Sequence, residues 1–97
     1  MTTAKFPLGQ IVATPGALVA MDESGQTPDF FLNQHHAGNW GIVDQEDWSL
    51  NDQALLDGSR ILSAYHTLKS KKLWVITEAA DDNGHRAATT ILLPEEY

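Results

Sequence analysis

Three runs rich in β-branched, aromatic and aliphatic residues occupy the last third of the chain, at residues 60–67, 72–79 and 86–93. Each run is separated from the next by a short polar segment, and the second of these segments contains Asn83-Gly84, a pair typical of tight hairpin turns. Runs of this length and composition, bounded by turn residues, are typical of β-strands. The pattern therefore predicts a three-stranded antiparallel meander.

The two faces of this meander are expected to differ in what covers them. Side chains alternate between the faces of a strand, so Ile61, Ser63 and Tyr65 lie on one face while Leu62 and Ala64 lie on the other. Neither set is wholly polar. We therefore expect one face to hold the helices and the other to be partly exposed or buried against a partner.

The upstream half of the chain reads as one short strand followed by three helices. The apolar run 8–13 is the strand, and the helices are expected at about 15–24, from 28 to a closing segment at 35–38, and at about 45–57. Thr14-Pro15 and Thr27-Pro28 each combine an N-cap residue with proline at the first helical position. Asp44 supplies the third N-cap, and glycines at 25 and 58 end the first and third helices.

These elements predict a single α+β domain over residues 1–97, with the order β-α-α-α-β-β-β. Three short helices are expected to pack on one face of an antiparallel sheet, whose C-terminal part is the three-stranded meander. The first strand is free to join an edge of that meander. With 97 residues, of which 42% are hydrophobic, the chain can build one core.

Charge is unevenly distributed along the chain and narrows the choice of partners. The net charge is −7, and it arises in residues 1–59, which hold eight acids and one base, Lys5. Residues 60–97 hold five acids and five bases. Nucleic acids and anionic membranes require a basic face, so we expect no direct binding to either. A basic protein partner is compatible with this layout.

Cysteine usage and hydropathy bear on location. The chain has no cysteine, which excludes disulfides, a thiolate nucleophile and a cysteine-based zinc site, and which is consistent with a reducing compartment. No apolar run approaches the roughly 18–20 residues needed to span a bilayer. The sequence therefore predicts a soluble cytoplasmic protein.

Catalytic and metal-binding motifs are missing from the sequence. It contains no phosphate-binding glycine loop and no nucleophile elbow. His35 and His36 are adjacent, so on a helix they diverge by about 100° and do not readily share one ion. We therefore predict ordinary surface or loop histidines, no catalytic residue, no metal and no cofactor. The remaining enzymatic alternative combines Glu78, Arg86 and His66 across the sheet, where a solvated cross-strand ion pair is the simpler interpretation.

The candidate binding surface is the acidic helix 45–57 with the turn before it. Trp40 is interpreted either as a core anchor or as a platform for a ligand. The acids are interpreted either as a solvated helix face or as an interaction patch. A sharper alternative is a phosphate mimic that inhibits a DNA-binding or defence protein, because carboxylates three or four positions apart approximate phosphate spacing. The predicted binding residues are Asp44, Glu46, Asp47, Asp52 and Trp40.

Several segments together resemble a known family. They are Gly9–Leu18, Gly25–Pro28, Phe31-Leu32, Gly38–Gly41, Glu46-Asp47, Leu62–Tyr65, Trp74–Glu78 and Ala88–Tyr97. In these segments the chain is similar to a family of short, functionally uncharacterised bacterial proteins associated with plasmids and other mobile elements. The resemblance spans nearly the whole chain and implies a plasmid-related accessory role, with no catalytic residue to carry over. We therefore predict a small acidic accessory protein that acts through protein–protein binding.

Overall fold

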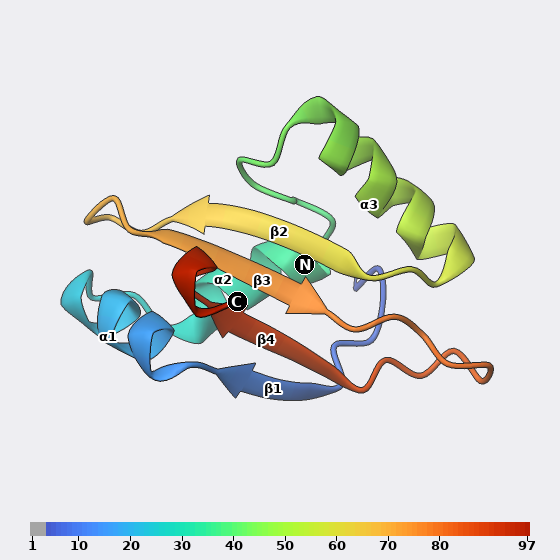
Figure 1. Cartoon of the computed structure of the whole chain (residues 1–97), viewed down its shortest axis with the longest axis horizontal. Helices are drawn as coiled ribbons and strands as arrows, with labels where there is room; N and C mark the ends of the chain where they lie inside the picture. The colour runs from blue at the N-terminus through green and yellow to red at the C-terminus, as the bar shows by residue number, and fades with distance from the viewer. Residues whose placement is uncertain (1–3) are drawn as a thin grey trace.

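The computed structural model describes residues 4–97 and contains one four-stranded sheet with three α-helices (Figure 1). The predicted α+β class and element order are confirmed. In chain order the elements are β1 (Gln10–Ala13), α1 (Pro15–Glu23), α2 (Pro28–His36), α3 (Gln45–Asp57), β2 (Ile61–His66), β3 (Lys72–Thr77), β4 (Ala88–Leu92) and a 3-10 helix, η1 (Pro94–Glu96).

The predicted meander is present, and β1 joins its outer edge. The strand order is β1-β4-β3-β2, and the β2–β3 and β3–β4 pairs are antiparallel. β1 runs parallel to β4, with Gln10 opposite Ala88 and Ala13 opposite Ile91. The sheet is therefore mixed rather than wholly antiparallel. A parallel pair needs a long connection between its strands, and here the chain passes through all three α-helices, β2 and β3 between β1 and β4.

The predicted helix ends are observed. The Thr14 hydroxyl accepts a hydrogen bond from the Ala17 N–H, and the Asp44 carboxylate accepts one from the Asp47 N–H at 2.8 Å. Gly58 ends α3 with φ at 81°, a left-handed conformation that glycine adopts without a steric penalty. Local sequence signals therefore set the starts of α1 and α3 and the end of α3.

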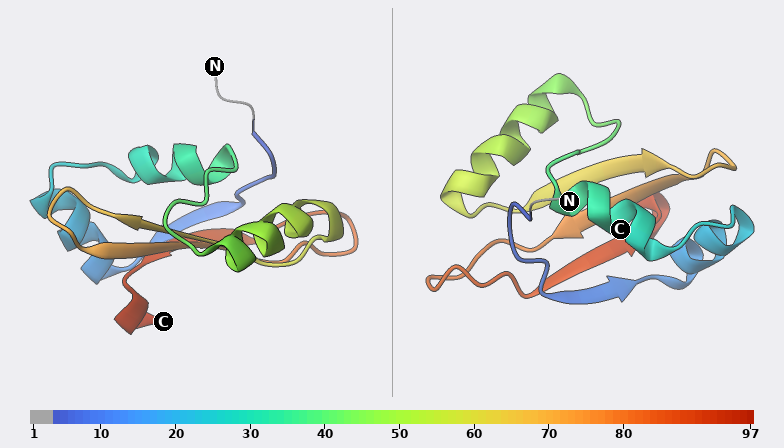
Figure 2. Two further views of the ribbon diagram at one scale, coloured as in Figure 1. Left: turned by 90° about the horizontal axis from the view of Figure 1, so that it is seen from above. Right: turned by 180° about the vertical axis from the view of Figure 1, so that it is seen from behind.

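One face of the sheet, which we call the first face, packs against the helices. α2 lies across this face, α1 lies near the end of the sheet, and α3 lies beside β2 (Figure 2). The first face carries the main core, in which side chains from α1 and α2 meet those of β2, β3 and β4: Ala17, Ala20, Met21, Phe31, Leu32, Tyr65, Leu73, Val75 and Ile91. A second cluster joins the N-terminal segment and α3 to β2 through Phe6, Trp40, Ala54 and Ile61.

The opposite face, which we call the second face, is covered mainly by the C-terminal tail, as Figure 2 shows. The Tyr97 ring packs edge-on against Trp74, with ring centres 5.7 Å apart, and the Arg60 guanidinium donates to the Tyr97 hydroxyl. Glu96 accepts hydrogen bonds from the N–H groups of Gly16 and Leu93. The tail therefore connects the start of α1 to the second face.

Candidate binding surface

The first turn of α3 presents three of the predicted binding residues to solvent. Asp44, Glu46 and Asp47 are all exposed. Asp44 also caps the helix, because its Oδ1 accepts the Asp47 N–H. Carboxylates at a helix N-terminus are stabilised by the helix dipole, so these acids contribute to α3 itself as well as to the surface. A partner could contact Glu46 and Asp47 without disturbing the cap.

Asp52 lies on a different side of α3. It is five positions beyond Asp47, which places it about 140° further around the helix. Its Oδ1 accepts a hydrogen bond at 3.0 Å from the indole N–H of Trp40. The four predicted acids therefore do not form one line, and this geometry does not favour the phosphate-mimic alternative.

Trp40 does not belong to the exposed surface. Its side chain is 0% exposed and packs with Phe6, Ala54 and Ile61. A fully buried indole cannot act as a platform for a ligand, so its inclusion among the predicted binding residues is corrected. Burial of the large ring and the hydrogen bond to Asp52 make Trp40 a core anchor that fixes the turn before α3.

Two shallow grooves meet at Arg60, on the second face. One has a volume of about 200 Å³ and is lined by Asp47, Leu50, Asn51, Arg60 and Leu62. The other has a volume of about 470 Å³ and extends across β3 and β4 to the C-terminal tail. Leu50 is 56% exposed and lies one turn after Asp47, so apolar and acidic side chains are adjacent here. In this α3–β2 groove one of the predicted acids, Asp47, borders an indentation.

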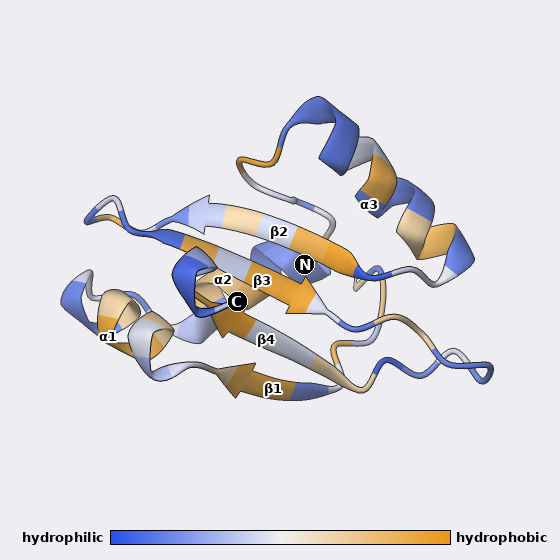
Figure 3. Ribbon diagram, in the orientation of Figure 1, coloured by the Kyte–Doolittle hydropathy of each residue, from blue (hydrophilic) through white to orange (hydrophobic). Residues whose placement is uncertain are grey.

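Exposed apolar side chains extend along the outside of α3. Leu56 is 90% exposed and Ile42, in the preceding turn, is 48% exposed. Figure 3 shows that hydrophobic and hydrophilic residues are interleaved along this helix. Isolated exposed leucines are normal on protein surfaces, but here they accompany a helix of which only Asn51 and Ala54 are buried. α3 therefore keeps most of its surface free for contact.

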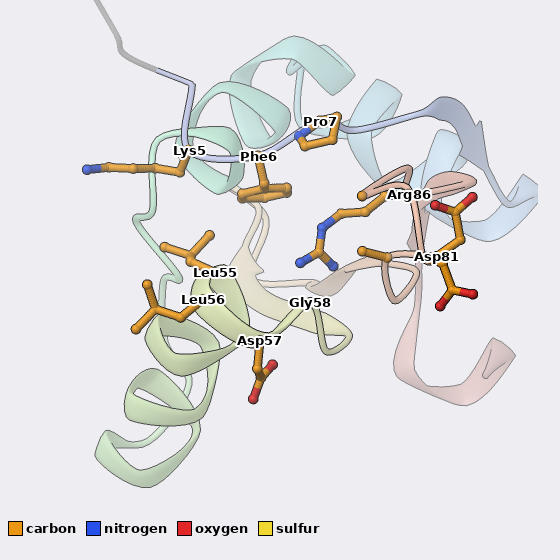
Figure 4. Close-up of a pocket in the computed structure, with 12 residues that line it drawn as sticks. Lys5, Phe6, Pro7, Leu55, Leu56, Asp57, Gly58, Asp81 and Arg86 are labelled. Carbon is orange, nitrogen blue, oxygen red and sulfur yellow. The ribbon is translucent and has the colours of Figure 1, made fainter.

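A third indentation surrounds Arg86 (Figure 4), with a volume of about 380 Å³. Arg86 is 6% exposed, and its guanidinium donates to the main-chain carbonyls of Ala54, Ser59 and Glu78, at distances of 2.8 to 3.1 Å. Burial lowers the pKa of Arg86, while the charge of Asp57 opposes that shift. Arg86 thus joins the end of α3 to the end of β3, and its role here is structural.

The residues of the enzymatic alternative are not brought together. His66 pairs with Lys72 at one end of the β2–β3 hairpin, whereas Glu78 follows Thr77 at the other end. Five residues of strand separate those ends by about 17 Å. Arg86 contacts the main-chain carbonyl of Glu78, and its guanidinium is turned toward α3. These positions do not form one catalytic site.

His35 is a core residue, and the prediction of an ordinary surface or loop histidine is wrong for it. Its side chain is 0% exposed, and its ring nitrogens contact the Ser63 and Thr77 hydroxyls. The hydroxyl of Thr77 lies 2.7 Å from that of Thr89, which donates to the Leu8 carbonyl. This chain of contacts, which we call the His35 network, crosses three strands beneath α2.

For a neutral imidazole, the His35 network fixes which ring nitrogen carries the proton. Since Thr89 gives its proton to Leu8, it must accept from Thr77, and Thr77 must then accept from Nε2–H of His35. Nδ1 is left to accept from Ser63. Burial, with smaller contributions from His36 and Arg86, lowers the pKa of the ring to about 3, so the imidazole is neutral near pH 7. The spacing Phe31–His35 on one helix face was the available sequence signal.

Comparisons with protein-family models, curated proteins and solved structures give no match to this chain. The resemblance to plasmid-associated proteins therefore stays a prediction. Among residues 4–97, no three histidine or acidic side chains are grouped so that they could hold a metal ion. No helix in this part of the chain is long and apolar enough to cross a membrane.

Proposed function

We propose that this chain is a small accessory protein that binds another protein through the first two turns of α3 and the adjoining groove of β2. The observation that carries the proposal is the α3–β2 groove, in which exposed Asp47 and half-exposed Leu50 border the same indentation. A partner surface with basic and apolar side chains matches this combination.

The placement of α3 supports the proposal. The helix lies beside the sheet rather than across it, and Asn51 attaches it to β2 through two hydrogen bonds to the main chain of Leu62. Asn51 lies on the side of α3 that faces β2, so this attachment leaves the opposite side of the helix available. Glu46, Asp47 and Leu50 remain exposed on a rigid element, so a partner would encounter them already ordered.

The experiment compares affinity capture from native cells with three baits: the wild-type protein, a Glu46→Lys/Asp47→Lys variant, and a control carrying two charge reversals elsewhere. Asp81 caps its own turn, so the control reverses Asp82 and Glu95, which are also exposed. A protein retained by the wild type and the control, but lost with the α3 variant, is the expected result.

The affinity of that protein is then measured by calorimetry at two salt concentrations. We expect the α3 variant to bind at least about tenfold more weakly, and wild-type binding to weaken as salt rises, because oppositely charged surfaces attract less under screening. Equal retention of every partner by the wild type and the α3 variant would contradict the proposed surface. A partner that is lost with the Asp82 and Glu95 control but retained by the α3 variant would also contradict it.

A further inference from the structure

The two outer strands of the sheet differ in how their free edges are protected. On β2, the outward main-chain groups of Leu62 bond to the Asn51 side chain, and those of Ala64 bond to Trp40 and Ile42. That edge is closed. On β1, the N–H groups of Gln10 and Thr14 donate to the carbonyls of Ala87 and Ile91, which lie just before and within β4. The main-chain groups of Ile11 and Ala13 therefore point away from the sheet.

The outer edge of β1 is open in the described part of the chain. Nothing in residues 4–97 bonds to the outward groups of Ile11 and Ala13, and no element lies outside β1 in Figures 1 and 2. Ile11 is 44% exposed and Val12 is 41% exposed. The strand contains none of the usual edge protection, since it has no lysine, no proline and no bulge. Such an edge is a template for a further strand.

We propose that the further strand is β1 of a second copy of this chain, paired antiparallel about a two-fold axis. Placing the axis at Val12 sets Ile11 opposite Ala13 of the other copy. The outward N–H and C=O groups of Ile11 and Ala13 on each strand can then all form hydrogen bonds to the other copy. Val12 faces its own counterpart on the second face. The dimer would extend the sheet to eight strands.

Other two-fold registers fit less well. Moving the axis to Ile11 requires Gly9, which has φ at 67° and lies outside the strand. Moving it to Ala13 requires Pro15, which has no N–H to donate and begins α1. The Val12 register uses only the residues of β1 itself.

Charge also favours a second copy at this edge. Each chain carries −7, so two copies repel unless they meet where charge is absent. Residues 6–21 contain no charged side chain, and β1 lies within that stretch. The exposed acids of α3 lie beside β2, at the opposite edge of the sheet. Two copies can therefore pair through β1 without placing acids directly opposite one another.

The register gives a direct test, because the chain has no native cysteine. Directly opposed residues of a non-hydrogen-bonded antiparallel pair have Cα atoms about 4.5 Å apart, within disulfide range. We expect Val12→Cys to form a covalent dimer under mild oxidation. Ile11→Cys, with similar exposure, should form it much more slowly, and so should Leu56→Cys, whose site is 90% exposed. Equal cross-linking of all three would indicate random collision and overturn the proposal.

Sedimentation of the native protein provides the second test, and circular dichroism confirms that each variant is folded. A four-residue edge gives a weak interface, so we expect dimer to appear between about 10 μM and about 1 mM. Dimerisation should strengthen with salt, which screens the repulsion between like-charged chains. Val12→Lys should abolish it, whereas Leu56→Lys should not. A wild-type protein that stays monomeric, or a dimer that survives Val12→Lys, would overturn the proposal.

Discussion

His35 shows how one buried side chain can make the whole fold sensitive to acid. The folded protein holds the ring neutral, with a pKa of about 3, whereas an unfolded histidine titrates near 6.5. Below pH 6.5 the unfolded state therefore binds a proton that the folded state excludes. The stability that the neutral ring provides is complete above pH 6.5 and is lost progressively as the pH falls toward 3.

We expect the free energy of unfolding to drop by on the order of 2 kcal/mol between pH 7 and pH 4.5 because of His35. Urea unfolding at several pH values, followed by tryptophan fluorescence, measures this drop. His35→Gln should be less stable at pH 7 but should lose most of the decrease between pH 6.5 and 4.5. His66→Gln, at an exposed position, is the matched control and should retain it. An unchanged pH dependence in His35→Gln would contradict the neutral-ring assignment.

At the scale of elements, the C-terminal tail and α1 depend on one another through Gly16. A Cβ at this position would lie 2.6 Å from a carboxylate oxygen of Glu96, closer than real Cβ contacts allow. Alanine is otherwise the better helix former by up to about 1 kcal/mol. The glycine is therefore explained by the carboxylate that bonds to its N–H at 3.0 Å and also to the Thr14 hydroxyl.

A double-mutant cycle separates these two effects. Gly16→Ala should destabilise the wild-type protein by about 1 kcal/mol, because it displaces the Glu96 carboxylate from the start of α1. In a Glu96→Ala background, the same substitution should be neutral or stabilising, since only helix propensity and a flexible Leu93 side chain remain. Urea unfolding of the four proteins gives the coupling energy. An identical effect of Gly16→Ala in both backgrounds would show that the tail does not dock there.

Elements with local signals were predictable from the sequence, whereas contacts between distant elements were not. Thr14-Pro15, Asp44 and Gly58 identify helix ends through interactions within a few residues, and these were correctly read. On α1, the spacing of Ala17, Leu18 and Met21 is that of an apolar helical stripe. In the structure Leu18 is nevertheless 49% exposed, while Ala20 is buried. Helical period alone left this choice open, because it depends on how α1 approaches the sheet.

The same limit applies to the candidate site. Exposure of Glu46 and Asp47 follows from their place in the first turn of an acidic helix, and it was predicted. The burial of Trp40 and the His35 network depend on which strand positions face each helix. Ser63, Thr77 and Thr89 come together only after the strand registers are set, over sequence separations that no local pattern reports.

At the scale of the whole molecule, the charge of −7 opposes the compact state. Residues 1–59 supply the excess of acids, and in the structure α3 carries many of them on exposed positions. Repulsion among these acids is stronger in the folded chain than in the expanded unfolded chain. Salt screens exposed charges over about 10 Å at 0.1 M, so added salt should relieve the folded state more than the unfolded one.

We therefore expect the thermal midpoint at pH 7 to rise by about 4–8 °C between low salt and about 0.5 M sodium chloride, corresponding to about 1 kcal/mol. The measurement is made at low micromolar protein, where the proposed β1 dimer is dissociated, so that screening acts within one chain. An Asp82→Lys/Glu95→Lys variant, which reduces the negative charge by four at exposed positions outside α3, should have a higher midpoint at low salt and a smaller response to salt. If salt lowers the midpoint of the wild type, attractive rather than repulsive charge contacts dominate its surface.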